Sequence, residues 1–192
     1  MAGVIGGDKF DARLKELAGR LGKAKSVSVG FLESKTYPDG TPVAYIAAIN
    51  EFGAQIEKSP RTATILKKVL KSGKIGKKGR FVKAGSAGAT PQSFEIPAHT
   101  VVIPARPFFR TMVRENQSSW GPQLASVLKA NDCDAAKALE LMGEGMSGQL
   151  QDSIRNWSEP PNAPSTVRKK GFNKPLVDQG VMLNSVGKQV DA

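Results

Sequence analysis

The side chains that could carry out catalysis or hold a metal ion are few and widely spaced in this sequence. His99 and Cys133 are the only histidine and the only cysteine, so nitrogen and sulfur ligands cannot build an ordinary four-ligand zinc site. A Ser-His-Asp arrangement needs a histidine that a carboxylate orients, and His99 lies beside Pro97 in an extended segment. Glu140 and Glu144 are one helical turn apart, as on many solvated helix faces. We therefore expect a protein that is not an enzyme and that uses no cofactor or metal.

Positive charge is concentrated in one part of the chain. The 192 residues include 28 Lys and Arg against 17 Asp and Glu, a formal net charge of +11. Ten of the basic residues lie in residues 58–94, which contain no acidic residue, so the rest of the chain has a net charge of only +1. Such a distribution predicts contact with an anionic partner. The candidate residues that face a partner or DNA are Arg61, Lys67, Lys68, Lys71, Lys74, Lys77, Lys78, Arg80 and Lys83.

The sequence of this basic segment leaves two interpretations open. Residues 73–80 are rich in glycine but lack the GxxxxGK(S/T) spacing of a phosphate-binding loop. The segment is either a loop that lysines keep soluble or an electrostatic contact to nucleic acid or to an acidic protein face. Phe81 is the only aromatic residue interleaved with the lysines, which disfavours sequence-specific reading of bases.

The elements that must position these residues begin with an amphipathic helix. In residues 8–21 apolar side chains recur every three or four positions, and residues 27–31 alternate as a half-buried strand does. The segment VAYIAAINEF, residues 43–52, is apolar on most of its surface, so we expect a buried helix. Gly53 should end that helix in the left-handed conformation, with Phe52 as its last core contact.

The middle of the chain predicts a mixture of short and long elements. The apolar spacing in residues 65–70 suggests a short helix, and residues 94–103 favour one or two strands. Pro107 can start a long helix, with a kink or break at Pro122.

A second long helix follows, and Asp132 or Asp134 can cap its start. An apolar stripe runs along this helix as far as Trp157. Three glycines interrupt the stripe, and each costs about 1 kcal/mol relative to alanine, so close backbone packing is a reason for keeping them. They are Gly143, Gly145 and Gly148.

The organisation expected from these elements is a single α+β domain over residues 1–192, with a small, mostly antiparallel sheet packed with several helices. The Gly- and Lys-rich residues 58–94 form its one flexible insertion, and residues 158–192 form an extended, Pro-rich C-terminal segment. The first residues lack the apolar core of a secretory signal, and no apolar run approaches the roughly 20 residues that span a bilayer. We expect synthesis in a cytoplasm and no membrane partner.

Three stretches of the sequence resemble a known class of proteins. Residues 49–54 are INEFGA, residues 103–110 are IPARPFFR, and the C-terminal run contains PNAPSTVRKKG, KPLVDQG and LNSV. In this order and spacing they resemble the minor tail, tail-completion and head-tail joining proteins of tailed bacteriophages. The likeness covers much of residues 43–190. The basic stretch between the first two motifs is longer than the pattern requires, as an insertion would be.

The resemblance implies a structural protein of the virion, made in the host cytoplasm, that performs no reaction. Its copies would form a cyclic homo-oligomer, sixfold or twelvefold, at the neck or at the head-proximal end of the tail, with a channel for DNA. Its partners would be itself, the neighbouring neck, connector or tail proteins and, non-specifically, the DNA in the channel. The alternative is a standalone nucleic-acid-binding protein whose lysine-rich residues 58–83 form the binding arm.

Overall fold

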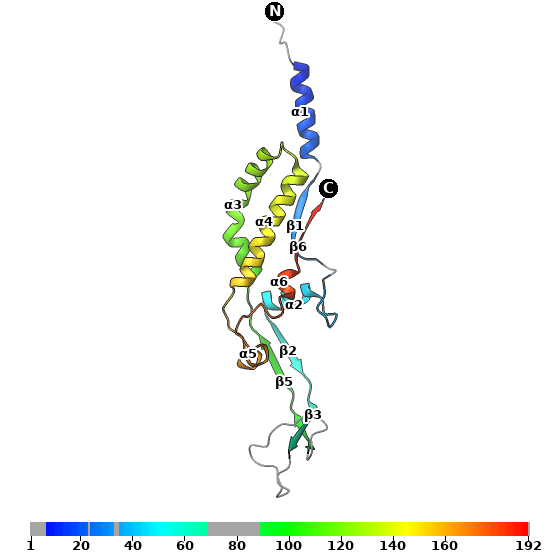
Figure 1. The fold of residues 1–192 in the computed structure, drawn as a ribbon, viewed down its shortest axis with the longest axis vertical. Helices are drawn as coiled ribbons and strands as arrows, with labels where there is room; N and C mark the ends of the chain where they lie inside the picture. Colours follow the sequence, from blue (N-terminus) through cyan, green and yellow to red (C-terminus); the bar gives the residue numbers. More distant parts are fainter. Residues whose placement is uncertain (1–6, 23, 33–34, 69–88, 192) are drawn as a thin grey trace, which may run out of the picture. The chain divides into compact units, whose positions relative to one another are not determined.

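The computed structural model describes residues 7–22, 24–32, 35–68 and 89–191 (Figure 1). The chain divides into two compact units, of which the second is Gln55–Ile103 and the first is the remainder. In the described ranges, helices and small antiparallel sheets make an α+β fold, as the sequence predicts. The helices are α1 (Gly7–Leu21), α2 (Val43–Phe52), α3 (Phe108–Ala130), α4 (Ala135–Asn156), α5 (Pro164–Lys170) and α6 (Val181–Asn184). The strands are β1 (Ser26–Phe31), β2 (Ala54–Lys58), β3 (Arg61–Lys68), β4 (Ala89–Ile96), β5 (His99–Ile103) and β6 (Val186–Asp191).

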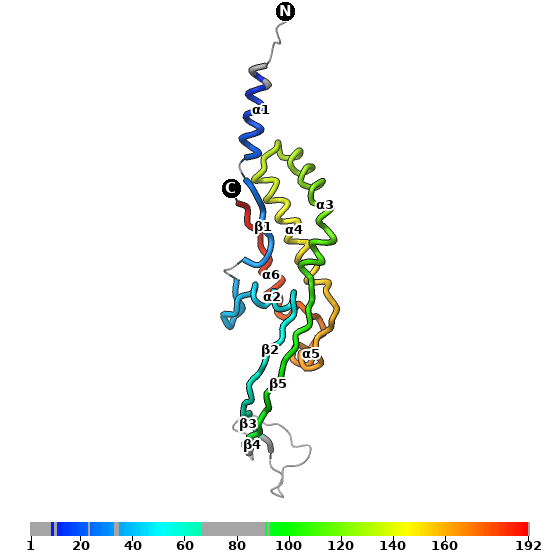
Figure 2. Tube along the Cα trace, turned by 180° about the vertical axis from the view of Figure 1, so that it is seen from behind, coloured from blue at the N-terminus to red at the C-terminus, as the bar shows by residue number. Residues whose placement is uncertain are grey.

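A two-stranded antiparallel sheet in the first unit joins segments from the two ends of the chain. Its strands β1 and β6 pair from Ser26 opposite Asp191 to Phe31 opposite Val186. Helix α4 packs against both strands and against α3, and the strands lie side by side in the tube of Figure 2. The predicted strand at residues 27–31 is thereby confirmed, and its partner comes from the far end of the sequence.

The core of the first unit collects side chains from each of its helices and strands except α1 and α5. Its largest fully buried side chains are Phe108, Leu150, Ile154 and Val43. Leu176 and Met182, from the C-terminal segment, are buried in the same cluster. Burial of a Leu, Ile, Val or Phe side chain contributes roughly 1.5–3 kcal/mol, so these contacts fix the otherwise irregular C-terminal segment onto the helices.

One of the three glycines of α4 is explained by close packing. A Cβ atom added at Gly143 would lie 2.8 Å from Cγ2 of Val27 on β1, closer than non-bonded carbons approach. Gly145 and Gly148 have no atom within 4 Å of such a Cβ, so the packing explanation is wrong for these two. The three glycines differ because only Gly143 lies on the side of α4 that packs against the sheet.

Helix α2 is buried on one face only, so the expectation of a largely buried helix is wrong. Val43, Ala47 and Glu51 face the core, whereas Tyr45 is 60% exposed and Phe52 is 68% exposed. Phe52 is therefore not the last core contact. The hydropathy of the sequence could not distinguish the two faces, since both are apolar except for Asn50 and Glu51 in the last turn.

Two further sequence expectations need correction at helix ends and breaks. Gly53 has the expected positive φ of 77°, but its ψ of 167° is extended rather than left-handed helical, so the chain passes directly into β2. Of the predicted kink or break at Pro122, the break is wrong, because α3 continues to Ala130. The carbonyl that Pro122 leaves without a helical donor belongs to Ser118, which is exposed and can be hydrated.

The second unit consists of two-stranded sheets. Strand β2 pairs with β5, and β3 pairs with β4 in an antiparallel register that runs from Arg61 opposite Ile96 to Lys68 opposite Ala89. The short helix suggested at residues 65–70 is wrong for its described part, which belongs to β3. Local spacing favoured a helix, but pairing with β4 makes this segment a strand. The pairing includes a 3.0 Å hydrogen bond between the hydroxyls of Thr64 and Ser93.

Candidate functional site

The basic residues identified from the sequence are not gathered at one point of the described structure. Arg61 begins β3 and is exposed, and Lys67 and Lys68 lie at the other end of that strand, about 20 Å away at the usual rise of a strand. The central part of the predicted flexible insertion, residues 69–88, lies outside the described residues. The same is true of Lys71, Lys74, Lys77, Lys78, Arg80 and Lys83.

The three motifs meet instead in the first unit, where the end of α2, the start of α3 and the C-terminal segment come together. The backbone N–H of Arg106 donates to the carbonyl oxygen of Asn50 at 2.6 Å. The Arg106 side chain donates to Asn50 Oδ1 at 3.2 Å and to the carbonyl oxygens of Pro160 and Pro161 at 3.1 and 3.3 Å. We call this cluster the Arg106 junction, and it comprises Asn50, Glu51, Arg106, Arg110, Pro160 and Pro161.

Arg106 at the centre of the junction is a buried cation. The residue is 6% exposed, and this burial lowers the pKa of its guanidinium. Among the described residues no carboxylate pairs with Arg106, so oxygen dipoles compensate its charge. The planar guanidinium suits this task, because its fixed fork of donors reaches several carbonyl oxygens at once.

Glu51 binds the first turn of α3. Its carboxylate accepts from the backbone N–H groups of Phe109 and Arg110, at 2.9 and 3.2 Å, and from Nε of Arg110 at 2.8 Å. These N–H groups have no partner within the helix, and the N-terminus of a helix favours a negative charge. Arg110 also donates to the Glu51 carbonyl oxygen at 3.1 Å, and its guanidinium lies 5.0 Å from the ring centre of Phe52. Glu51 thus ties α2 to α3 without any residue from the intervening strands.

Sequence reasoning missed this role of Glu51 and assigned its neighbours only to helix endings. One signal was available, because Glu51 is the single charged residue of a largely apolar helix. A carboxylate in that position is costly to bury unless donors satisfy it. Which donors do so was not visible, since Arg110 is 59 positions away in the sequence.

A second cation holds the C-terminal segment in a loop. Lys170 Nζ donates to the carbonyl oxygen of Lys174 at 2.6 Å and to that of Val177. Its ammonium also lies 5.0 Å from the ring centre of Phe172. Burial lowers the pKa of Lys170, while the carboxylate of Asp178 acts in the opposite direction. Leu176 and Met182 of the same segment belong to the buried core of the first unit.

Two of the hollows at the surface of the first unit are lined by both polar and apolar side chains. One, of about 310 Å³, lies beside the junction and is lined by residues that include Tyr37, Asn50, Asn162 and Lys170. The other, of about 480 Å³, lies between α3 and α4 and includes Glu115 and Asp152. Neither contains a histidine or a cysteine that could act as a base or nucleophile.

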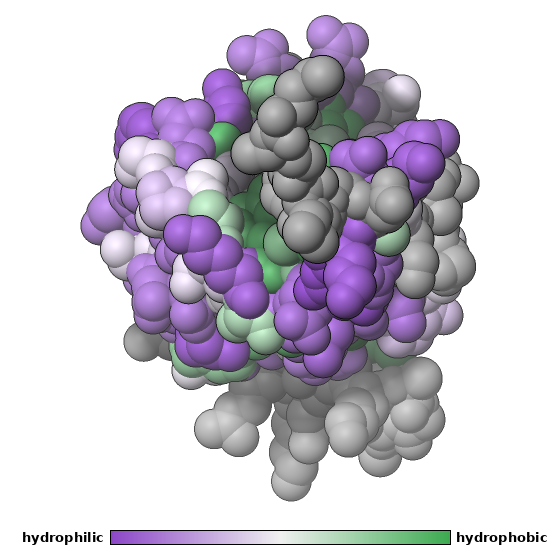
Figure 3. All heavy atoms as spheres, turned by 90° about the horizontal axis from the view of Figure 1, so that it is seen from above, coloured by the Kyte–Doolittle hydropathy of each residue, from purple (hydrophilic) through white to green (hydrophobic). Residues whose placement is uncertain are grey.

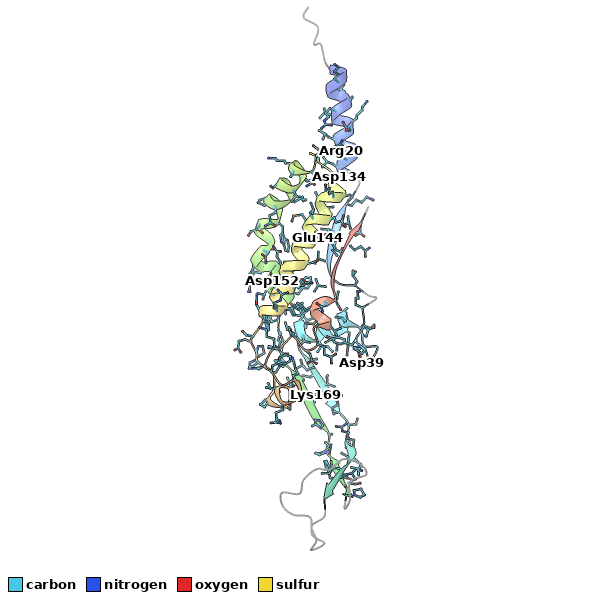
Figure 4. All side chains as sticks on the ribbon, in the orientation of Figure 1. Arg20, Asp39, Asp134, Glu144, Asp152 and Lys169 are labelled. Carbon is cyan, nitrogen blue, oxygen red and sulfur yellow. The ribbon has the colours of Figure 1, made fainter. Side chains whose placement is uncertain are left out.

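The remaining candidates for chemistry are accounted for by simple contacts. Glu140 and Glu144 on α4 both bind Lys188 Nζ, at 3.3 and 2.9 Å, so they form an ion-pair cluster with exposed carboxylates. Glu144 is labelled in Figure 4. His99 is exposed, with Nδ1 3.0 Å from the carbonyl oxygen of Pro97. In the part of the chain that the structure describes, no group of three or more His, Cys, Asp or Glu residues could hold a metal ion.

Comparison with known proteins adds no assignment. No protein-family model, no curated protein and no solved structure matches the chain. None of the described helices has the length and apolar character needed to cross a membrane.

Proposed function

We propose that this chain is a structural protein of a tailed bacteriophage that forms a ring at the head-tail junction or at the head-proximal end of the tail. The observation that carries the proposal, beside the resemblance of the three motifs, is the outer face of α2. This face carries Ala44, Tyr45, Ala48 and Phe52, which are all exposed and uncharged. Contiguous exposed apolar side chains mark a surface that another protein covers.

The Arg106 junction supports this function by fixing the outer face of α2 within the first unit. Asn50 and Glu51 lie in the last turn of α2. Glu51 accepts from the start of α3, and Asn50 accepts from Arg106, which also donates to the carbonyl oxygens of Pro160 and Pro161. A ring closes only when each subunit repeats the same rotation, so the surfaces that meet must be held in fixed orientations. A buried hydrogen-bonded network provides that rigidity.

In the proposed ring, one surface of each subunit meets a different surface of the next, and the closed ring leaves a channel for DNA. The protein makes and breaks no covalent bond in this role. The lysine-rich residues 58–83 face a neighbouring ring or the DNA, where positive charge provides orientation and non-specific attraction.

Electron microscopy of a lysate from a phage whose gene for this chain is deleted tests the proposal. We expect DNA-filled heads and separate tails, and we expect the purified chain to restore joined particles when added to the lysate. Joined, infectious particles in the absence of the chain would rule out the proposed function.

Two solution measurements distinguish this function from standalone nucleic-acid binding. Light scattering should give the mass of a closed oligomer, and DNA affinity should be weak at physiological salt. A monomer that binds DNA with an affinity falling steeply as salt rises would favour the alternative.

A further inference from the structure

Helix α1 carries an apolar stripe whose two outer members are exposed and whose middle member is half-buried. Leu14, Leu17 and Leu21 lie at positions i, i+3 and i+7, the spacing of one helix face. Leu14 is 48% exposed and Leu21 is 47% exposed. Figure 3, viewed from the end where α1 lies, shows apolar surface among hydrophilic side chains. This stripe has the anchor spacing of a helix that binds in an apolar groove.

The polar contacts of α1 leave this stripe available. Arg20 donates to the carbonyl oxygen of Asp132 at 3.2 Å, close to Asp134 at the start of α4 (Figure 4). Glu16 binds Arg13 and Arg20 within the helix. These contacts use the face of α1 that carries Arg13, Glu16 and Arg20. Leu14 and Leu21 lie to one side of that face, and Leu17, which is half-buried, lies next to it.

The outer face of α2 has the complementary shape. Ala44 and Ala48 are one turn apart and form a low ridge, which lets another helix approach closely, and Tyr45 and Phe52 stand beside it. An almost wholly apolar hollow of about 240 Å³ adjoins the ridge, lined by residues that include Phe31, Phe52 and Phe109.

One border of the leucine stripe carries a carboxylate, whereas Arg13 and Arg20 lie along its other border. Arg110 lines the edge of the apolar hollow, and its side chain is 60% exposed although it binds Glu51. Asp11 is exposed and precedes Leu14 by three positions, so it lies at the border of the leucine stripe. An α1 helix seated on α2 can therefore place a carboxylate opposite a guanidinium.

These two faces cannot meet within one chain. Strand β1 connects them, with α1 before it and α2 after it, and it pairs with β6 along all six of its residues. Six residues of strand span about 20 Å, so the pairing holds the two helices apart. In Figures 1 and 2, α1 and α2 lie beyond opposite ends of β1.

We propose that the leucine stripe of α1 in one copy docks on the outer face of α2 in the next copy. This inference rests on the proposed ring and identifies the pair of surfaces that builds it. The contact is heterologous, because a donor helix meets a different acceptor helix, so every subunit uses both surfaces once the ring has closed. The acceptor face has no basic residue on its ridge, which fits an apolar helix rather than a nucleic acid.

Charge introduced on either face tests the contact in the full-length chain. Leu14→Glu on the donor and Ala48→Glu on the acceptor should each weaken self-association at least tenfold, because burying a carboxylate against apolar side chains costs more than a contact with the exposed Arg110 returns. Matched controls are Ala12→Glu, on the opposite side of α1, and Ala125→Glu, on an exposed part of α3; both should assemble as the unaltered chain does. Sedimentation gives the oligomer mass, and circular dichroism verifies that each variant is folded.

Mixing the two defective variants provides the sharper test. The Leu14→Glu chain keeps an intact acceptor face on α2, and the Ala48→Glu chain keeps an intact donor helix α1. These two surfaces can bind each other, but the remaining donor and acceptor both carry a substitution and cannot form a second contact. We expect a 1:1 dimer of defined mass from two species that are monomeric alone. No dimer on mixing would overturn the inference, as would rings that persist in either variant.

The outcomes separate this inference from the proposed function. Rings that persist in both variants leave a ring protein that uses other surfaces, so only the docking contact is wrong. An unaltered chain that stays monomeric at all concentrations tested overturns the docking contact, and the deletion phage then decides the proposed function independently.

Discussion

At the scale of single residues, two buried charges organise the first unit, and both are satisfied by hydrogen bonds. Glu51 binds backbone and side-chain donors at the start of α3, and Arg106 binds carbonyl oxygens of the C-terminal segment. A buried polar group that loses its partner costs more than an exposed ion pair contributes. The stability of this unit should therefore depend strongly on these two positions.

Replacing Glu51 by glutamine should destabilise the protein by about 1–3 kcal/mol. The amide keeps one acceptor oxygen, but it loses the charge that α3 and Arg110 favour and places a donor NH₂ group against backbone N–H groups. Urea unfolding measures the free energy. Glu140→Gln is the matched control, because that exposed carboxylate binds only Lys188 and should contribute less than about 1 kcal/mol. Equal effects at the two positions would contradict the role assigned to Glu51.

Replacing Arg106 by lysine should also destabilise the protein, again by about 1–3 kcal/mol. A lysine keeps the charge but has a single ammonium, so it cannot reach Asn50, Pro160 and Pro161 with the fork of a guanidinium. The unfolding midpoint in urea measures the loss. Arg155→Lys, at an exposed ion pair with Asp152, serves as the control and should change stability by less than about 0.5 kcal/mol. An unchanged midpoint for Arg106→Lys would mean that water replaces the lost hydrogen bonds.

At the scale of elements, helix α4 is the support on which the β1–β6 sheet lies. Only one of its glycines faces that sheet, and the approach there is closer than any side chain allows. Close packing therefore requires glycine at position 143 but not at positions 145 and 148. Substitutions at these positions should differ in their effect on stability.

Alanine at Gly143 should destabilise the protein by about 1–3 kcal/mol, because its Cβ would overlap the branched side chain of Val27. Alanine at Gly145 should stabilise it by up to about 1 kcal/mol, since the new methyl group meets no atom within 4 Å and alanine favours the helix. Thermal unfolding of the two variants compares them directly. Shifts of the same sign would contradict the packing of α4 on β1.

At the scale of the whole molecule, net charge and function are linked through the basic segment. The described part of this segment includes Arg61, Lys67 and Lys68 on β3, and the remaining lysines lie outside the described residues. The charge of the segment is not needed to balance the rest of the chain, which is close to neutral. We therefore expect the segment to act on partners and not on the stability of the fold.

Glutamine at six of these lysines should leave the protein folded and equally stable, because solvated lysines contribute within about 0.5 kcal/mol each. In the proposed function, the same variant should join heads to tails poorly, and worse as salt rises, since complementary charge sets orientation and encounter rate. Counting joined particles by electron microscopy at two salt concentrations measures this. Normal joining would contradict this role and favour the other interpretation, a loop that lysines keep soluble. The six positions are Lys67, Lys68, Lys71, Lys74, Lys77 and Lys78.

The sequence by itself determined the elements whose pattern is local. The periodicity of residues 8–21 and the alternation at residues 27–31 gave α1 and β1, and Asp134 caps α4 through the N–H of Lys137, as one of the two predicted caps. Such features follow from neighbours within one turn or one strand, so the residues that decide them are adjacent in the chain.

Only the tertiary structure decided features that depend on distant partners. Residues 65–68 became strand because residues 89–92 pair with them, and one apolar face of α2 became surface because the core accepts only the other. Glu51 and Arg106 acquired their roles from residues more than 50 positions away, across contacts that no local spacing records. The physical reason is that burial and hydrogen bonding are satisfied by whatever the fold brings near, and sequence distance does not limit that choice.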